Sequence, residues 1–454
     1  MKYQAYEVYR KCSFPLIESI PEHWVEQKIK FQLEDCIAGG TPDSGNKDYW
    51  EESGEGVPWV SIADMTSNEI IEQTQKDISK AGIDVKNLKL VPQGSLLYSI
   101  FASLGKVAEA GVDLTTNQAI LALIPSDSVC NKYFRYWLIS IEDYLMYFST
   151  SNTQNNLNAE KVRNLPLFLP RREVQANIAN FLDHETAKID TLIKKQQQLI
   201  KLLKEKRQAV ISHAVTKGLN PNAPMRDSGV EWLGEVPEHW VVSQIGHCAF
   251  VTKLTGFEYT NLWKIEEGGE IVALRGFNVK ERALDLDNVE RISSELSNVL
   301  KRSKLASGDI VFPCTGTIGN AAMIERDNEF HINQNIAKIR FDETVYAKYA
   351  TYWMTSLFVR TLIDRNNTSG MQPVVLIGDI RKLPMPRFKF QEQKEITDFL
   401  DSTVGKFNVL ITNSENAIEL MQERRTALIS AAVTGKIDLR NWQVANKENK
   451  ETAL

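Results

Sequence analysis

The sequence predicts an α+β protein in which two α/β domains follow one another, each closed by a long α-helix, with the two helices paired as an antiparallel coiled coil. Three observations support this prediction: the length of the chain, an internal repeat, and an apolar heptad pattern at the end of each repeat. At 454 residues the chain is long enough for two or three domains that each bury their own core.

The composition is that of an ordinary globular protein, with 43% hydrophobic and 24% charged residues, which excludes a disordered or collagen-like chain. No stretch reaches the roughly 18 to 20 apolar residues of a membrane span, and no apolar segment follows the charged amino terminus. We therefore expect a cytoplasmic protein. The five cysteines lie far apart without a CxxC pair, so neither a disulfide framework nor a zinc site is predicted.

An internal repeat divides the chain into two halves. Residues 163–219 align without a gap with residues 381–437 and share about 21 identities in about 57 positions, where unrelated sequences share about three or four. Upstream, the halves also share Ile20-Pro21-Glu22-His23-Trp24 with Val236-Pro237-Glu238-His239-Trp240, Asn117-Gln118 with Asn333-Gln334, and Tyr133, Tyr136 and Trp137 with Tyr349, Tyr352 and Trp353. The repeat indicates a tandem duplication.

The duplication predicts the domain boundaries. They are an amino-terminal lead (1–19), domain 1 (20–172), spacer helix 1 (173–219), a linker (220–235), domain 2 (236–387), spacer helix 2 (388–437) and a carboxy-terminal tail (438–454). Short β-rich runs between Gly and Pro residues, at 57–62, 95–101, 271–274 and 309–312, indicate α/β or mostly β domains. A proline pair closes each domain, at Pro166 and Pro170 and at Pro384 and Pro386, before the helical pattern begins.

The helical segments, from about 173 to 217 and from about 391 to 435, carry apolar residues at alternate steps of four and three, as coiled coils do. The apolar seam of the first is predicted at Ile178, Leu182, Ile189, Leu192, Leu199, Leu203 and Val210, and that of the second at Ile396, Leu400, Phe407, Leu410, Met421 and Leu428. Polar residues interrupt both seams at matched places: Glu185 and Thr403, Gln196 and Ser414, Lys206 and Arg424. They either fix helix register and partner docking or face solvent as the seam precesses.

The length of the helices suggests a spacer. A helix of about 45 residues is about 68 Å long, which is more than the packing of one 150-residue domain requires. Two copies lying antiparallel generate a pseudo-two-fold axis, and we expect this arrangement to place the domains at opposite ends.

Sequence signatures of an enzyme are absent. No Gly-Lys-Ser or Gly-Lys-Thr completes a Walker A loop, no Asn-Pro-Pro-aromatic sequence marks an adenine methyltransferase, and no HxxxH or HExxH pair is available for zinc. We expect no metal site and no catalytic residue. His23 and His239 are predicted to be structural because they lie in the repeated entry segment, and Asp183 and Asp401 to interact with a helix amino terminus or a basic residue.

Several repeated motifs together resemble the specificity subunits of type I restriction-modification enzymes. The likeness rests on the Pro-Glu-His-Trp entry, the Leu-Pro closure followed by Phe-Leu-Asp (165–183 and 383–401), the helix ending Glu205 to Thr216 and Glu423 to Thr434, and the linker segment 227–234. It covers nearly the whole chain. The amino-terminal lead departs from the pattern, since residues 10–19 lack the Asp-Ser-Gly-Val-Glu-Trp-Leu-Gly-Glu sequence of the linker, although Leu16 and Ile17 match Trp232 and Leu233.

The resemblance implies the function, the partners and the cofactors. Each domain is expected to be a target recognition domain that reads one half of a bipartite sequence in double-stranded DNA, and the helices to set the spacing and dock two modification (methyltransferase) subunits. Restriction (endonuclease/translocase) subunits are further implied partners, in a system of phage defence. S-adenosylmethionine, ATP and magnesium are expected in the partner subunits, and no cofactor in this chain.

The charge distribution restricts where DNA can bind. The net charge of the whole chain is −5, with about −6 on domain 1 and about zero on domain 2, so any DNA-binding face is local and supplemented by partners. The basic residues of domain 2 that lie close in sequence are Arg275, Lys280, Arg282, Arg291, Lys301, Arg302 and Lys304. Acidic residues are interspersed among them, so an ordinary solvated surface is the alternative interpretation.

Polar loops supply the candidates for base reading, since base edges are read by Arg, Lys, Asn, Gln, Ser and Thr. The candidates are Thr41, Ser44, Asn46, Lys47, Asn152, Thr153 and Gln154 in domain 1, and Lys253, Thr255, Arg275, Lys280, Asn366, Asn367, Thr368 and Gln372 in domain 2. A competing hypothesis is a coiled-coil scaffold that presents two protein-interaction domains without binding DNA. Selection of a bipartite sequence from random DNA distinguishes the two.

Overall fold

The computed structural model describes residues 3–14, 17–101, 103–147, 157–366 and 373–443. The chain divides into two compact units, one formed by residues 1–195 with 417–454 and the other by residues 196–416. Each unit therefore contains one globular domain, half of one long helix and half of the other. None of the helices in the described part of the chain is long and apolar enough to cross a membrane.

Unit 1 contains a five-stranded sheet of order β4-β12-β9-β10-β7, a four-stranded sheet of order β11-β6-β8-β5, and the strand pairs β1-β2 and β13-β3. Its strands are β1 (Tyr9–Lys11), β2 (Ser19–Pro21), β3 (Val25–Lys28), β4 (Leu33–Ala38), β5 (Trp50–Glu51), β6 (Val57–Val60), β7 (Ile70–Ile71), β8 (Asp77–Ile78), β9 (Leu96–Ser99), β10 (Val107–Ala110), β11 (Thr115–Thr116), β12 (Ile120–Pro125) and β13 (Pro166–Leu169). Only β10-β7 and β11-β6 are parallel pairs in this unit, among the described residues.

Unit 2 contains sheets of order β17-β23-β20-β21 and β19-β18-β22, and the pairs β14-β15 and β16-β24. Its strands are β14 (Met225–Asp227), β15 (Glu235–Pro237), β16 (Val241–Gln244), β17 (Ala249–Thr252), β18 (Ile271–Leu274), β19 (Glu290–Ile292), β20 (Ile310–Pro313), β21 (Ala322–Met323), β22 (Phe330–Ile332), β23 (Ile336–Phe341) and β24 (Pro384–Arg387). The four β-rich runs predicted from the sequence correspond to β6, β9, β18 and β20, which confirms them.

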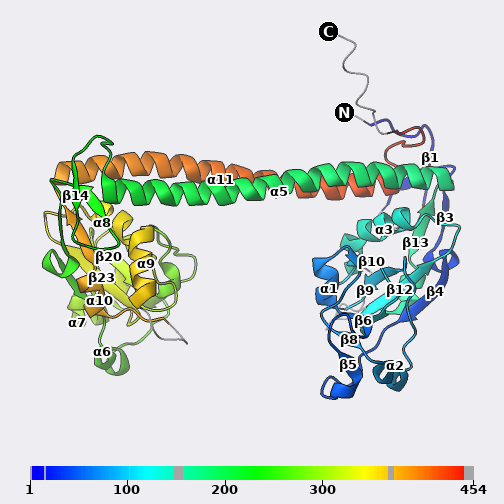
Figure 1. The fold of residues 1–454 in the computed structure, drawn as a ribbon, viewed down its shortest axis with the longest axis horizontal. Helices are drawn as coiled ribbons and strands as arrows, with labels where there is room; N and C mark the ends of the chain where they lie inside the picture. The colour runs from blue at the N-terminus through cyan, green and yellow to red at the C-terminus, as the bar shows by residue number, and fades with distance from the viewer. Residues whose placement is uncertain (1–2, 15–16, 102, 148–156, 367–372, 444–454) are drawn as a thin grey trace, which may run out of the picture. The chain divides into compact units, whose positions relative to one another are not determined.

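Helices complete both units (Figure 1). The short ones are α1 (Ile62–Ser67), α2 (Lys80–Lys86), α3 (Asn131–Ser140) and α4 (Ala159–Arg163) in domain 1, and α6 (Gly256–Asn261), α7 (Ser294–Val299), α8 (Ala347–Met354), α9 (Leu357–Asn366) and α10 (Ile377–Lys382) in domain 2. The 3-10 helices are η1 (Ile29–Gln32), η2 (Lys47–Tyr49), η3 (Glu142–Tyr147), η4 (Ile245–His247), η5 (Gly276–Asn278) and η6 (Lys301–Ser303). The long helices are α5 (Arg172–Lys217) and α11 (Phe390–Val433). The predicted α+β class with two spacer helices is confirmed.

The central strands are apolar throughout because both faces of their sheets are buried. In β9, Leu96 and Tyr98 belong to one apolar cluster and Leu97 to another. In β20, Ile310 and Phe312 likewise face one cluster while Val311 faces a second. Successive side chains point to opposite faces of a strand, so each sheet separates two apolar layers.

Both spacer helices contribute to the apolar core of each unit. In unit 1, Ile178 near the start of α5 lies in the same buried cluster as Val433 at the end of α11. In unit 2, Val215 near the end of α5 shares a cluster with Ile396 near the start of α11. Within each unit the two helix segments run antiparallel and lie side by side, as the green and orange segments of unit 2 in Figure 1 do. The predicted antiparallel pairing is thus present in each unit.

The aromatic residues repeated between the halves make the same contacts twice. The Tyr133 hydroxyl donates to the Val433 carbonyl at 3.3 Å, and the Tyr349 hydroxyl donates to the Val215 carbonyl at 3.1 Å. Both tyrosines are fully buried. Trp137 and Trp353 each donate their indole N–H, at 2.9 Å, to the carbonyl of the proline that opens the closing strand of the domain. The tyrosine bonds thus join each domain to the end of the helix that belongs to the other half of the sequence, and the tryptophan bonds stay within each domain.

The entry segments pack on the carboxy-terminal ends of the helices. Gly218 follows α5 and Gly435 follows α11, both with φ of +74°, the left-handed conformation that commonly ends a helix. Trp240 lies against Gly218 and Trp24 against Gly435, and both tryptophans are buried. The interpretation of the repeated entry as structural is confirmed for these tryptophans.

The degenerate amino-terminal lead folds as its counterpart in the linker does. Strand β1 pairs with β2 in the register that β14 and β15 adopt. Arg10 donates to the Trp24 carbonyl at 2.8 Å, as Arg226 does to the Trp240 carbonyl at 2.5 Å. Ile17 is buried like Leu233. The local contacts therefore survive although most of the sequence pattern is lost.

The predicted heptad seam follows the buried stripe of the helices only in part. Ile178, Leu182, Ile189, Ile396 and Leu400 are buried, and Leu203, Val210, Phe407, Met421 and Leu428 are half-buried. Leu192, Leu199 and Leu410 are 48%, 43% and 50% exposed, so they do not contribute to the buried stripe of the paired helices and stay predicted for partner docking.

The difference lies in which residues of each heptad face inward. The inward-facing residues still repeat every seven positions, through half-buried Ile193 and Ile200 and buried Ile411, each one residue later than predicted. The alternation of four and three that is typical of coiled coils is therefore kept, but the step after Ile189 is four residues and not three. Lys206 and Arg424 are exposed in the same way, and the neighbouring Arg207 and Arg425 are half-buried in their place.

Replacing the buried tryptophan at a helix end tests this packing. Trp240→Ala is expected to lower the free energy of unfolding by about 3 to 5 kcal/mol, because it empties a fully buried aromatic site. Trp232→Ala is the matched control, since Trp232 is 52% exposed, and should cost less than about 1 kcal/mol. Urea denaturation followed by circular dichroism measures both. Equal losses in the two variants would contradict the packing described here.

Candidate functional site

The repeated Asn-Gln pair forms the same turn in both domains. The Asn117 side-chain oxygen accepts from the Ala119 N–H at 3.0 Å, and that of Asn333 accepts from the Asn335 N–H at 2.9 Å. Each turn lies immediately before a central strand, β12 or β23. Asparagine commonly closes such a turn on its own backbone, so the asparagine shapes the turn and the following glutamine is presented at its end.

In domain 1 the glutamine meets the polar loop that follows β4. The Thr41 hydroxyl donates to the Gln118 side-chain oxygen. A Cβ at Gly39 would lie 2.2 Å from the Asn117 carbonyl, so only glycine permits this close approach. Trp59 donates its indole N–H to the Gly40 carbonyl at 3.0 Å. The loop is therefore held against the turn at Gly39 and Thr41 and against β6 at Gly40.

In domain 2 the same turn borders a cavity of about 420 Å³. Its walls come from four segments: α6 and the chain after it, the start of the 275–290 segment, the loop after β20, and the Asn-Gln turn. The lining residues are Tyr259, Ile265, Arg275, Gly276, Phe277, Glu290, Thr315, Gly316, Thr317, Asn333, Gln334 and Asn335. The side chains that line this cavity include hydrogen-bond donors, hydrogen-bond acceptors and aromatic rings.

Gln334 has an unsatisfied acceptor at this cavity. Its side-chain oxygen is covered from solvent and has no hydrogen-bond partner among the described residues. A buried polar atom without a partner costs about 1 to 3 kcal/mol, so such an atom at a cavity wall is a candidate for binding a ligand donor.

Arg275 is the basic side chain of the cavity. Its guanidinium pairs with Glu290 at 2.5 Å and lies 5.0 Å from the centre of the Phe277 ring. The side chain remains 45% exposed. Phe277 and Tyr259 are themselves 40% and 36% exposed. An arginine next to exposed aromatic rings can hydrogen-bond a base edge while the rings stack on a base.

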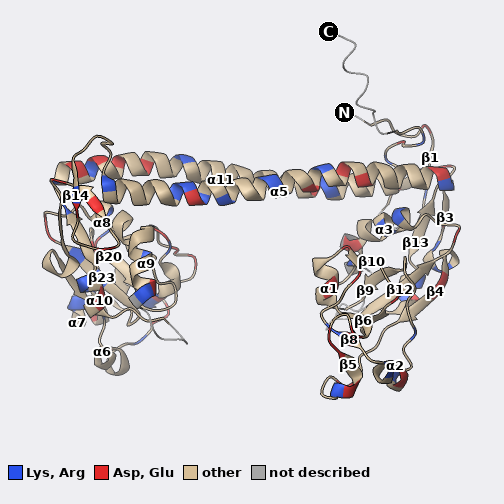
Figure 2. Ribbon diagram, viewed as in Figure 1, with Lys and Arg blue, Asp and Glu red and all other residues tan. Residues whose placement is uncertain are grey.

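Positive charge is not concentrated on one face of either domain. Figure 2 shows acidic residues interspersed with basic ones over both domains and both long helices. Four of the seven basic residues clustered in the domain 2 sequence form ion pairs with neighbours: Arg275, Lys280, Arg282 and Arg302. Most of the positive charge of this cluster is therefore balanced within the domain, in line with the alternative interpretation of a solvated surface.

The other predicted site residues have varied surroundings. Ser44 and Lys47 are exposed, and Asn46 accepts from the Asp48 N–H to begin a 3-10 turn. Thr255 caps α6, where its hydroxyl donates to the Glu258 carboxylate at 2.7 Å, and Lys253 is half-buried. Asn152, Thr153, Gln154, Asn367, Thr368 and Gln372 lie outside the described residues, as does the side chain of Asn366. Of the predicted residues that the structure describes, the cavity brings only Arg275 together with other polar groups.

The sequence-based set lacks four residues that line the cavity, Gln334, Asn335, Phe277 and Tyr259, and the equivalent glutamine of domain 1, Gln118. The repeat contains the signal for the glutamines, because Asn117-Gln118 and Asn333-Gln334 occupy equivalent positions. A search for polar loops misses these glutamines, because each lies just before an apolar strand, β12 or β23. The two aromatic rings have no counterpart in the repeat.

The described residues offer no metal site, and the cysteine beside the cavity is not activated. No group of three or more His, Cys, Asp and Glu side chains within the described part of the chain is arranged to hold a metal ion. All five cysteines are free. Burial raises the pKa of Cys314, beside the cavity, to about 11, so its thiol is protonated at neutral pH.

The repeated acidic and histidine residues have structural contacts. The Asp183 carboxylate accepts from the Tyr136 hydroxyl at 2.8 Å, as the Asp401 carboxylate does from the Tyr352 hydroxyl. His239 contacts the Glu392 carboxylate at 2.8 Å, and the His23 ring lies 5.3 Å from the Tyr6 ring. Each aspartate therefore connects a domain to the long helix that follows it.

Comparison with known proteins identifies the class. A family model described as "Type I restriction modification DNA specificity domain" matches residues 22–202 and 237–420. These two matches follow the internal repeat and cover most of the chain. The chain therefore belongs to the type I restriction-modification DNA specificity family.

Individual relatives agree with this assignment. The type I restriction enzyme MjaIX specificity subunit of Methanocaldococcus jannaschii is 30% identical over 40% of this chain and 42% of its own length, so this match spans less than half of that relative. The EcoBI specificity subunit of Escherichia coli is 22% identical over 88% of this chain and 85% of its own length.

The fold is also found among solved structures. One from a study of the "complex assembly and conformational transition of the type I R-M system" has a TM-score of 0.70 at 12% identity, covering 92% of this chain and 99% of that one. At this identity the likeness concerns the fold.

Removing the unsatisfied acceptor tests the cavity. Gln334→Leu is expected to keep or raise the free energy of unfolding, by up to about 1 to 3 kcal/mol, and to weaken binding of duplex DNA. Gln118→Leu is the matched variant in domain 1; it loses the contact with Thr41 and should not gain stability. Chemical denaturation and DNA titration measure the two effects separately. Unchanged DNA affinity in Gln334→Leu would exclude the glutamine from the binding site.

Proposed function

We propose that this chain is the non-catalytic DNA sequence-recognition subunit of a type I restriction-modification complex. Each domain reads one half of a bipartite target in double-stranded DNA. The two spacer helices set the distance between the halves and dock the methyltransferase subunits. Modification and cleavage take place in partner subunits, so this chain contributes the choice of sequence and no chemistry.

The observation that carries this proposal is the duplicated Asn-Gln turn at the polar loops of both domains. One glutamine contacts the Thr41 loop. The other lines the cavity together with Arg275 and exposed aromatic rings, and its covered side-chain oxygen has no partner among the described residues. Side chains that bind base edges in this way discriminate between bases by about 1 to 3 kcal/mol for each good pair. Two non-identical sites on one duplicated frame suit a target with two different halves.

The exposed apolar residues of the long helices support partner docking. Leu192, Leu199, Leu202, Val409, Leu410 and Leu420 are between 43% and 64% exposed. Because α5 and α11 are copies of one helix, two modification subunits are expected, one for each related surface. S-adenosylmethionine belongs to those subunits, and ATP with magnesium to the restriction subunits that complete the assembly in the cytoplasm.

Exchange of one domain tests whether the halves act independently. Replacing residues 20–170 with the equivalent domain of a relative is expected to change one half-site only, because each domain has its own turn and loops. The assembled complex is incubated with a pool of duplexes randomised across the target, and the enriched sequences are read. A chimaera that changes both half-sites would contradict independent reading, and a wild-type complex that enriches no bipartite sequence would contradict the proposed function itself.

Shortening the helices tests their role as a spacer. Deleting residues 194–197 and 412–415 together removes about 6 Å of helix, close to two base pairs at 3.4 Å each. Four residues turn a helix by about 400°, so the domains rotate little. We expect both half-sites to be kept and the gap between them to shorten.

The control for this deletion is assembly of the complex, measured by size-exclusion chromatography with light scattering. An assembled variant that methylates DNA with the original gap would show that the helices do not measure the DNA.

A further inference from the structure

Arg207 of α5 connects the paired helices with domain 2. Its guanidinium donates to the Asn408 side-chain oxygen of α11 at 2.6 Å and pairs with the Glu281 carboxylate of domain 2 at 3.3 Å. The Arg207 and Glu281 side chains are only 19% and 25% exposed. Ion pairs that are largely shielded from solvent are screened less by salt than surface pairs. One side chain therefore contacts two elements that are distant in sequence.

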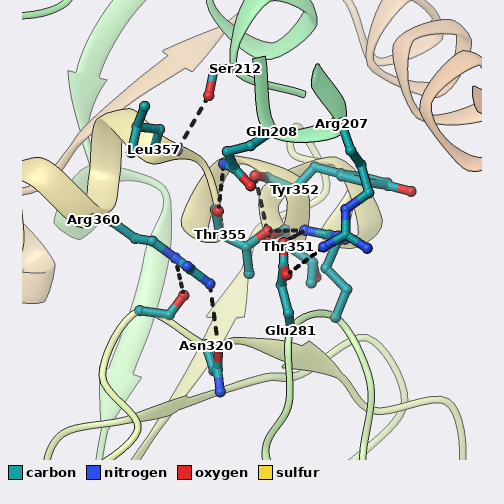
Figure 3. A network of polar contacts seen from close by, with 12 residues as sticks. Arg207, Gln208, Ser212, Glu281, Asn320, Thr351, Tyr352, Thr355, Leu357 and Arg360 are labelled. Carbon is teal, nitrogen blue, oxygen red and sulfur yellow. Dashed lines mark hydrogen bonds and ion pairs between the residues drawn. The ribbon is translucent and has the colours of Figure 1, made fainter. Parts of the chain in front are cut away.

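Glu281 also pairs with a second arginine, Arg282 (Figure 3). Its carboxylate pairs with Arg282 at 2.6 Å, and the Arg282 guanidinium also donates to the Thr355 hydroxyl at 3.0 Å. Arg282 lies 5.1 Å from the Tyr352 ring and is 12% exposed. Its φ of +64° lies in the left-handed region, which is unfavourable for a non-glycine residue. The contacts of both arginines with Glu281 thus hold this strained backbone in place.

The same face of α5 contacts the junction between α8 and α9. Gln208 donates to the Thr355 carbonyl at 3.3 Å, and the Leu357 N–H donates to the Ser212 hydroxyl at 3.3 Å. Figure 3 shows Arg207, Gln208 and Ser212 on the side of the helix that faces these residues. The helix therefore holds the strained segment and this junction together.

The strained segment leads directly to the cavity. Arg275, Gly276 and Phe277 line the cavity and precede Glu281 by only a few residues. The Thr317 hydroxyl donates to the Gly276 carbonyl at 2.6 Å, and the Asn320 amide donates to the Val279 carbonyl at 3.0 Å. These bonds join the segment to the loop that forms the opposite wall.

Arg360 of α9 secures that second loop. Its guanidinium donates to the Gly319 carbonyl at 3.3 Å and to the Asn320 side-chain oxygen at 3.5 Å, as Figure 3 shows. Two of the four segments that line the cavity are thus connected, through α9 or through Glu281, to residues that α5 contacts directly.

Domain 1 has a comparable arrangement built from different positions. Arg425 of α11, which is equivalent to Arg207 in the repeat, pairs with Asp190 of α5 at 3.0 Å and with Glu69 of domain 1 at 3.9 Å. Glu69 pairs with Arg135 at 2.7 Å, and Arg135 lies 6.0 Å from the Tyr136 ring. Glu69 and Glu281 do not align, nor do Arg135 and Arg282. In both domains an arginine of a long helix pairs with a glutamate of the domain, and that glutamate pairs with a second arginine. The glutamate and the second arginine come from different positions of the repeat.

We propose that Arg207 and Arg425 are positioning residues for recognition, each setting how one domain is held against the spacer helices; for Arg207 the connection extends to the loops that line the cavity. This inference rests on the proposed function. A change at Arg207 is expected to alter discrimination at the half-site of domain 2 and to leave the other half-site unchanged, and a change at Arg425 to do the reverse. Arginine suits the role because its planar fork contacts two acceptors at once.

The test measures discrimination at each half-site separately. The wild-type assembled complex first selects its bipartite sequence from a randomised duplex pool. Wild type, Arg207→Met and Arg425→Met are then titrated with the selected duplex and with duplexes carrying one wrong base pair in one half-site. Arg207→Met is expected to lose about tenfold in discrimination at the second half-site, the scale of couplings carried by such networks.

Matched variants separate positioning from general damage. Lys206→Met changes the exposed neighbour of Arg207 and should leave both half-sites unchanged. Arg207→Lys keeps the charge and should recover part of the discrimination. Glu281→Gln should reproduce the effect of Arg207→Met, and the double variant should be no worse than either one, because both changes break the same link. Thermal denaturation and light scattering establish that each variant folds and assembles.

Three outcomes would overturn the inference. Equal loss at both half-sites in Arg207→Met would indicate a general structural role, and unchanged discrimination in a folded, assembled variant would exclude any role. If the wild-type complex enriched no sequence, the proposed function would fail and the positioning role with it. The first two outcomes leave the proposed function intact.

Discussion

The structure depends on one constraint: neither globular domain completes its apolar core without segments of both long helices. Val433 of α11 is buried with domain 1, and Val215 of α5 is buried with domain 2. Each helix thus begins on the domain that precedes it in the chain and ends on the other. Because buried apolar surface is the main stabilising contribution to folding, helix pairing and domain folding are coupled within each unit.

This coupling explains which residues are repeated. The tyrosine, tryptophan and aspartate residues common to both halves hold the domains on the helices, through bonds such as Tyr133 to Val433 and Tyr349 to Val215. The loops between them differ, as expected where two domains read different DNA sequences. The glutamines of the Asn-Gln turns are repeated in both halves, but the loops beside them differ.

The ion pairs of Arg207 and Arg425 connect the repeated helices with the parts of the domains that differ between the two halves. Arg207 and Arg425 occupy equivalent positions on the helices, yet their partners Glu281 and Glu69 come from non-equivalent positions in the domains. A constant helix residue can in this way hold domains whose surfaces differ. In the proposed function the long helices serve as a spacer, as a docking surface and as the support of the two domains.

The sequence by itself determined the duplication, the α+β class, the positions of β6, β9, β18 and β20, and the two long helices, because a repeat and an apolar period are local properties of the chain. The motifs that resemble the specificity family were also recognisable in the sequence. The tertiary structure decided which residues of each heptad face inward, since the pairing of the helices turns Ile193 inward and leaves Leu192 exposed. It alone decided the composition of the cavity and the contacts of Arg207, because these join residues that are distant in sequence and depend on how separate segments pack.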